Sequence, residues 1–226
     1  MTDSPRFVYG LSFILAFCSL TYELVFAQVL SVCLGGTKYQ YLLTISLFTC
    51  ALGAGSLYFG VLKKRVPTKL LFLNVEIFLT FLGFTGPFII TWLLRISDGP
   101  VFYEHLSKAI SYLFIFLIGF FSGFELPCLF SMAENKEGKI LAFDYMGMLG
   151  ASLFFPLIGL PLLGTAGTAL ATSNINLMAI VLIRPSQSVL ARNLLLILNL
   201  FIFGLILFFR EELNHLLSSI YLMGVK

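Results

Sequence analysis

Charged side chains are scarce in this sequence of 226 residues. Only 11% of the residues are charged and 59% are hydrophobic, whereas a soluble domain has about 25% charged residues. The composition therefore excludes an ordinary soluble domain. The 14 lysines and arginines stand in short connections and form no basic stripe, so nothing in the sequence indicates nucleic-acid binding.

Histidine and cysteine are also few, with two and four residues respectively. Cys18, Cys33, Cys50 and Cys128 lie inside hydrophobic runs without metal or redox spacing, so we expect packing roles for them. The sequence predicts no metal and no cofactor. It contains no recognisable pairing of a nucleophile with a base, and we do not expect this chain to be an enzyme by itself.

Long apolar runs fill most of the chain. A helix needs about 20 apolar residues to cross a bilayer, and the sequence has seven such runs. They predict an all-α, polytopic membrane helix bundle in which residues 1–226 form a single transmembrane domain. The predicted helices are 7–33, 40–62, 68–94, 109–131, 140–160, 163–183 and 190–209. The tail, 210–226, has leucines at helical spacing and predicts an amphipathic surface helix.

The distribution of basic residues predicts an orientation. Nine lysines and arginines fall on the side of the N-terminus and five on the opposite side. Because cytoplasmic connections are enriched in these residues, the N-terminus is expected in the cytoplasm. The resulting interpretation is an integral protein of the bacterial inner membrane.

Small residues recur at the spacing that brings helix backbones together. The residues predicted to pack between helices are Gly53, Gly55, Gly119, Gly123, Gly147 and Gly150. Their positions predict that the second, fourth and fifth helices form the centre of the bundle. They do not form a phosphate-binding loop, because no strand precedes them and no lysine follows.

The two halves of the chain share short similarities. Residues 21–24 are similar to 123–126, and 52–59 are similar to 149–155. Two interpretations stay open. One is an inverted repeat of three plus three helices with one helix added, an arrangement known from transporters. The other is chance similarity, because apolar helices draw on few residue types.

Carboxylates inside apolar runs are the main candidates for a site. Glu125 and Asp144 are expected near the cytoplasmic interface, and Glu23 is expected deeper. Intramembrane carboxylates are costly and usually face a bundle interior. No predicted helix offers a lysine or arginine to neutralise them, so they must be protonated, hydrogen-bonded or bound to a cation. Tyr22 and Tyr145 adjoin two of them and complete the candidate ligand set.

Two further residues bear on this set. Pro127 cannot donate a backbone hydrogen bond, so it is expected to leave the carbonyl of Gly123 free near Glu125. A structural role stays open for each carboxylate, since Asp144 is shallow enough to cap a helix or meet water. For Glu76, in the third predicted helix, a structural role is the favoured interpretation.

The motifs Gly123-x-Glu125-x-Pro127, Asp144-x-x-Gly147, Phe155-Pro156 and Pro161-x-x-Gly164 resemble the membrane domain of integral-membrane spermidine synthase-like proteins. Residues 22–23, 35–37 and 52–56 are similar to the opening of the same domain, although Cys18, Ser19 and Thr21 depart from its small residues. In that family a soluble domain transfers an aminopropyl group to a polyamine. The resemblance implies the membrane part without that catalytic domain.

Two functions follow as alternatives. The first is binding or transport of a small cation or a polyamine in an acidic intramembrane cavity, with Glu23, Glu125 and Asp144 at the matching positions. The second is a non-catalytic scaffold that assembles a partner, such as a separate aminopropyltransferase or a larger membrane complex. The expected partners are the lipid bilayer, a protein partner or a second copy of the chain, and a cation or polyamine.

Overall fold

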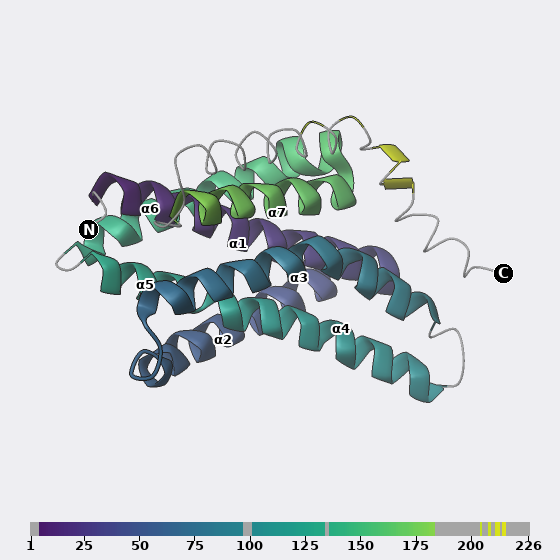
Figure 1. Ribbon diagram of the computed structural model, residues 1–226. Helices are drawn as coiled ribbons and strands as arrows, with labels where there is room; N and C mark the ends of the chain where they lie inside the picture. Colours follow the sequence, from purple (N-terminus) through teal and green to yellow (C-terminus); the bar gives the residue numbers. More distant parts are fainter. Residues whose placement is uncertain are drawn as a thin grey trace.

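The computed structural model describes residues 5–96, 101–133 and 136–183, together with 204, 208, 211, 212, 214 and 215. Every regular element in these ranges is a helix (Figure 1). The helices are α1 (Pro5–Leu34), α2 (Thr37–Leu62), α3 (Thr68–Ile96), α4 (Val101–Ser122), α5 (Glu125–Met132), α6 (Glu137–Phe154), the wider π-helical segment η1 (Phe155–Leu163) and α7 (Gly164–Ile183). The predicted all-α class is confirmed.

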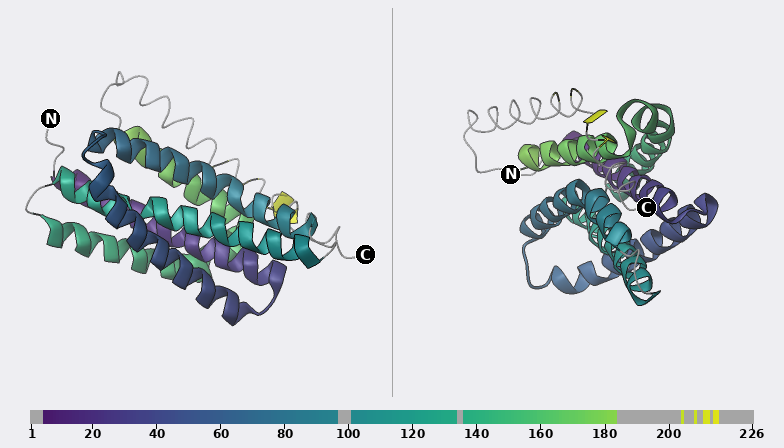
Figure 2. Two further views of the ribbon diagram at one scale, coloured as in Figure 1. Left: turned by 90° about the horizontal axis from the view of Figure 1, so that it is seen from below. Right: turned by 90° about the vertical axis from the view of Figure 1, so that its right-hand side faces the viewer.

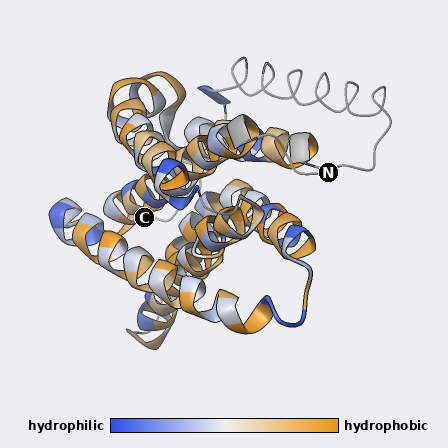
Figure 3. Cartoon of the chain, turned by 90° about the vertical axis from the view of Figure 1, so that its left-hand side faces the viewer, coloured by the Kyte–Doolittle hydropathy of each residue, from blue (hydrophilic) through white to orange (hydrophobic). Residues whose placement is uncertain are grey.

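The number of membrane-spanning helices differs from the prediction. Among the described residues, five helices are long and apolar enough to cross a membrane, and the fifth, Glu137–Val181, has 45 residues. This segment joins the fifth and sixth predicted runs. Most of the seventh run, 190–209, and most of the tail 210–226 lie outside the described residues. Seven spans are therefore not supported. Hydrophobic residues line the helices, and the most hydrophilic ones gather at helix ends and in the α2–α3 connection (Figure 3).

Contacts between side chains fix the helix directions. Ser12 Oγ donates to the carbonyl of Ile140 at 3.0 Å, and the rings of Phe17 and Phe154 lie 5.2 Å apart. Residue numbers thus rise together, so α1 and α6 are parallel. Cys18 Sγ instead contacts the carbonyl of Thr172, while Val25 packs with Ala169, so α1 and α7 are antiparallel. The chain consequently reverses between η1 and α7.

The centre of the bundle is α1. It packs against each of the other six α-helices. In the most apolar stretch of α1, 67% of the residues are buried, whereas the corresponding share for α2 is 22%. Figure 2 shows α6 and α7 on one side of α1 and the α2–α4 group on the other. The prediction that the second, fourth and fifth helices form the centre is therefore wrong. Spacing of small residues identifies close contacts between pairs of helices, but it does not show which helix all the others share.

The fourth predicted helix is interrupted. The chain leaves α4 after Ser122, turns through Gly123 and Phe124, and begins α5 at Glu125. Pro127 lies in the first turn of α5, where a missing N–H is tolerated. Glu125 is the acidic residue of that turn, and a carboxylate there interacts favourably with the helix dipole. The helical segment thus departs from regular α-helix at Gly123 and Phe124, ahead of Pro127, and Glu125 begins its second part.

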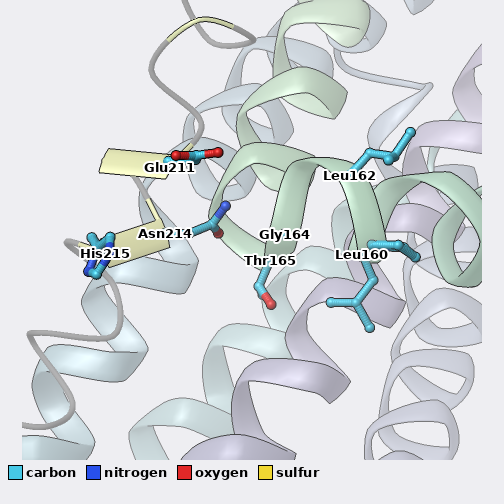
Figure 4. A pocket seen from close by; sticks show the side chains of 8 residues that line it. Leu160, Leu162, Gly164, Thr165, Glu211, Asn214 and His215 are labelled. Atoms are coloured by element: carbon cyan, nitrogen blue, oxygen red, sulfur yellow. The ribbon is translucent and has the colours of Figure 1, made fainter.

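The reversal between η1 and α7 is fastened by a residue from much later in the chain. Gly164 makes the turn with a φ of 70°. Asn214 Oδ1 accepts a hydrogen bond from the backbone N–H of Ala166 at 3.2 Å, and Asn214 Nδ2 donates to the carbonyl of Leu163. In Figure 4 the Asn214 side chain lies against this turn, on a hollow of about 570 Å³ that Glu211 and His215 also line. Asn214 therefore binds backbone groups on both sides of the turn, at the end of η1 and at the start of α7.

Replacing Asn214 by Ala is expected to destabilise the turn by about 1–2 kcal/mol, the usual cost of losing a helix cap. Asn214→Asp keeps the acceptor for Ala166 and loses the donor for Leu163, so we expect an intermediate loss. Unfolding of the purified protein by dodecyl sulfate in mixed micelles measures both. Equal stability of all three proteins would contradict this role of Asn214.

Candidate functional site

A cavity of about 400 Å³ lies between four helical segments. Its walls come from α1, α2, α6 and the junction of α4 with α5. The residues that line it are Ala16, Ser19, Leu20, Glu23, Phe48, Thr49, Leu52, Ser56, Ser122, Gly123, Glu125, Leu126, Leu141, Asp144, Tyr145 and Met148. The cavity thus brings together three carboxylates from three different helices.

All three predicted carboxylates, Glu23, Glu125 and Asp144, line this cavity. Glu23 and Glu125 are 6% and 8% exposed, so both are removed from the outer surface of the bundle. On α1 the cavity wall extends from Ala16 to Glu23, about 10 Å along the helix at 1.5 Å per residue. Glu23, which the sequence predicted to lie deeper than the other two carboxylates, is thus at one end of this wall.

The cavity contains no compensating cation, since no lysine, arginine or histidine is among its lining residues. Nor do the carboxylates converge on one point. Within the described segments, no group of three or more His, Cys, Asp or Glu side chains is close enough to hold a metal ion. The carboxyl groups are thus distributed over the walls. This arrangement suits a ligand with several positive groups better than one compact ion, which needs six or more oxygens around one centre.

Two hydroxyl groups add to the site. The Oγ atom of Ser19 is buried and has no hydrogen-bond partner among the described residues, while that of Ser122 interacts with the Glu125 carboxyl, and both residues line the cavity. A buried polar group without a partner costs about 1–3 kcal/mol. A ligand with an N–H donor would satisfy Ser19. The sequence contains a signal for both serines. Ser19 precedes Glu23 by four residues and Ser122 precedes Glu125 by three, and residues three or four apart are neighbours on a helix.

The two tyrosines of the candidate set lie differently. Tyr145 lines the cavity and is 61% exposed. Tyr22 is 1% exposed and points away from it, with its hydroxyl donating to Ser173 Oγ at 3.3 Å on α7. Tyr22 is therefore not part of the cavity wall. Adjacent residues on a helix face different directions, so its place next to Glu23 in sequence carried no information about the site.

Close backbone approaches surround the cavity at most of the predicted glycines. A Cβ atom on Gly55 would meet the carbonyl of Phe120, one on Gly123 would meet that of Leu52, and one on Gly147 would meet that of Phe13. Gly119 is similarly close to the backbone of Phe48.

Gly150 and Gly53 are different. A Cβ on Gly150 would lie 3.6 Å from the rings of Phe13 and Phe17, an ordinary contact. A Cβ on Gly53 would meet nothing within 4 Å, and Gly53 is exposed. Gly53 therefore does not pack between helices of the described bundle, because it lies on the outer face of α2.

Comparison with known proteins gives one group of relatives. A polyamine aminopropyltransferase of Leptospira interrogans is 32% identical over 161 residues, which cover 69% of this chain and 30% of that protein. Polyamine aminopropyltransferase 2 of Ralstonia nicotianae is 28% identical over 165 residues, 69% of this chain and 31% of that protein. A polyamine aminopropyltransferase of Oceanobacillus iheyensis is 28% identical over 179 residues, 76% of this chain and 34% of that protein.

The chain is thus homologous to polyamine aminopropyltransferases over most of its length, while it spans only 30% to 34% of these three relatives. No family model matches the chain, and neither does any solved structure. The relation predicted from the motifs at Glu125, Asp144 and Gly164 is supported at this level.

Proposed function

We propose that this protein is an integral membrane protein that binds a polyamine or a similar small organic cation in the acidic cavity. The observation that carries the proposal is the meeting of Glu23, Glu125 and Asp144 in one cavity without a basic residue in its walls. Carboxylates inside an apolar bundle are expensive and usually mark a ligand or ion pathway. The names of the relatives give the polyamine as the first ligand to test.

The shape of the site favours a polyamine over a metal ion. A polyamine is a thin chain with several ammonium groups, each of which donates hydrogen bonds and none of which needs a complete shell of oxygens. Carboxyl groups on three different helices can pair with such groups at separate points. The hydroxyl oxygens of Ser19 and Ser122 supply further acceptors.

Direct binding tests the proposal. Purified protein in detergent is titrated with spermidine by calorimetry, with magnesium and sodium salts as competitors at matched ionic strength. We expect saturable binding of spermidine that magnesium does not displace. Binding with the same affinity for every cation, or none for spermidine, would contradict the proposal. Uptake of labelled spermidine into proteoliposomes then separates transport from binding alone.

We further propose that the Glu137–Val181 segment crosses the bilayer twice, reversing at Gly164. Antiparallel α6 and α7 support this. A segment of 45 residues is also about twice as long as one crossing requires. Together with the predicted run 190–209 this gives seven spans.

The bias of basic residues orients these spans with the N-terminus in the cytoplasm. Single cysteines at Thr37 and Lys136, each in a background without native thiols, test this orientation. We expect an impermeant maleimide to label intact cells at position 37 only, because positions 37 and 136 lie at opposite ends of the bundle. Labelling at position 136 in intact cells would contradict the proposed orientation.

An inverted repeat would place the cavity between equivalent halves, and the helix pairing supports one. In such a repeat α1 would correspond to α4 with α5, α2 to α6 with η1, and α3 to α7. The contact of α1 with α6 would then be equivalent to the contact of α4 with α2, and both helix pairs are in close contact. The similarity of 52–59 with 149–155 does not add support, because Leu52 lines the cavity and Leu149 does not. The proposal therefore rests on helix arrangement.

A scaffold is the second candidate, and one observation favours it. The chain spans only 30% of the Leptospira interrogans relative, a share that suits a part that anchors or assembles a partner as well as one that binds a ligand. In that case a purified complex should contain an aminopropyltransferase, and the cavity carboxylates should be dispensable for its assembly. Assembly that survives neutralisation of the cavity, without spermidine binding to the wild type, would favour the scaffold.

A further inference from the structure

Glu76 is a fourth carboxylate, and it lies outside the cavity. It stands on α3 with 0% of its surface exposed. Neither carboxylate oxygen has a hydrogen-bond partner among the described residues. An ionised carboxylate in such a place costs several kcal/mol. A structural role for Glu76 therefore requires some way to stabilise this buried carboxyl group.

Asn176 of α7 lies beside this carboxyl. It is 1% exposed, and its Nδ2 group donates to Thr80 Oγ1 at 3.2 Å and to the backbone carbonyl of Glu76 at 3.5 Å. The amide group of Asn176 also interacts with the Glu76 carboxyl, although neither carboxylate oxygen has a well-formed hydrogen bond. The Oδ1 atom of Asn176 has no partner among the described residues. An acceptor without a donor therefore lies beside a buried carboxyl at the α3–α7 contact.

The neighbouring helices do not supply a positive charge. The titratable groups that interact with Glu76 are Cys18 and Tyr22 on α1 and Glu125 and Cys128 on α5. On the facing part of α4, Phe121 packs against Phe78, and α7 presents the Asn176 amide. None of these groups is a cation. A negative charge on Glu76 would also repel one on Glu125.

We propose that Glu76 and Asn176 form a proton-binding site that fastens α3 to α7. One proton on the Glu76 carboxyl turns an acceptor into an O–H donor, and the side chain beside it, Asn176, has an Oδ1 acceptor without a partner among the described residues. The proton removes the buried charge and supplies a donor for this acceptor. Glu125 lines the cavity and interacts with Glu76, so the proton site and the cavity share this neighbour.

The two residues are also 100 positions apart on antiparallel helices, in similar segments, Asn74-Val75-Glu76-Ile77 and Asn174-Ile175-Asn176-Leu177. In an inverted repeat, equivalent residues touch each other only at the symmetry axis. A proton site here would therefore join the two halves of the bundle at their axis.

The proton site predicts a stability that depends on pH. If the folded protein holds a proton on Glu76 that the unfolded chain has released, the folded state binds one proton more, and stability falls as pH rises. One proton changes the unfolding equilibrium constant by up to about tenfold per pH unit. Glu76→Gln keeps the shape and an N–H donor without a titrating proton, so this variant should lose that part of the slope.

The test compares unfolding by dodecyl sulfate at about pH 6 and about pH 9 for the wild type, Glu76→Gln and the matched surface control Glu137→Gln. We expect the wild type and the control to lose stability at the higher pH and Glu76→Gln to lose clearly less. An equal loss in all three proteins would overturn the proposal.

Infrared spectroscopy provides a readout that does not depend on stability. A protonated carboxylic acid has its own carbonyl band, and the difference between wild type and Glu76→Gln should contain one. Asn176→Leu removes the acceptor, so it should shift that band and leave its intensity unchanged. Absence of the band from the difference spectrum would mean that Glu76 is ionised, which contradicts the proton site.

Discussion

The Glu125→Gln, Asp144→Asn double variant is expected to bind spermidine about a hundredfold more weakly than the wild type. A hydrogen bond to a charged group contributes about 1.5–3 kcal/mol, and 1.4 kcal/mol is a factor of ten in affinity. Each substitution keeps the shape of the side chain and removes its charge, so each should cost tenfold or more. Calorimetric titration of the purified variants measures the effect.

The matched control is Glu137→Gln, which neutralises a carboxylate in the exposed first turn of α6, outside the cavity. It removes the same charge from the protein, so a purely long-range electrostatic effect would appear in it too. We expect its affinity to stay within twofold of the wild type, since Glu137 is exposed and interactions of exposed charges are weakened by solvent and salt. Unchanged binding in the folded double variant would remove Glu125 and Asp144 from the site.

Much of the fold is visible in the sequence because apolar runs of bilayer length have few alternatives to helices. The first six predicted runs all coincide with helical segments, with α4 and α5 sharing one and α6 and η1 sharing another. The break at Gly123 and Phe124 was not predicted, since Pro127 indicated a kink and not where the helix would end. The reversal at Gly164 depends partly on Asn214, a contact across 48 residues that no local pattern contains.

The candidate site was predictable to a similar degree. The cost of a charge in an apolar run identified Glu23, Glu125 and Asp144, and this argument depends on residue type alone. It could not tell which carboxylates share a cavity, so Glu76 looked equivalent in depth although it faces Asn176. The packing of α1 against α6, and of α2 against α4, determines which carboxylates share the cavity. This packing depends on the whole bundle, and the residue pattern of one helix does not reveal it.

Gly55 and Gly53 give the second large effect, because they lie on one helix in opposite environments. A Cβ on Gly55 would meet the carbonyl oxygen and carbon of Phe120, so the obstacle is backbone and cannot rotate away. Overpacking a rigid contact costs about 1–3 kcal/mol for each small increase in size, and occasionally more. Gly55→Leu should therefore separate α2 from α4, with an unfolding free energy lower by about 3 kcal/mol or more.

Gly53→Leu makes the same chemical change where a Cβ meets nothing within 4 Å, and it replaces glycine by a better helix former. We expect its stability to equal or slightly exceed that of the wild type in dodecyl sulfate unfolding. The pair also tests the cavity, since α2 and the α4–α5 junction form two of its walls. If Gly55→Leu is as stable as Gly53→Leu, the close approach of α2 to α4 is wrong. If it folds but no longer binds spermidine, the ligand depends on that approach.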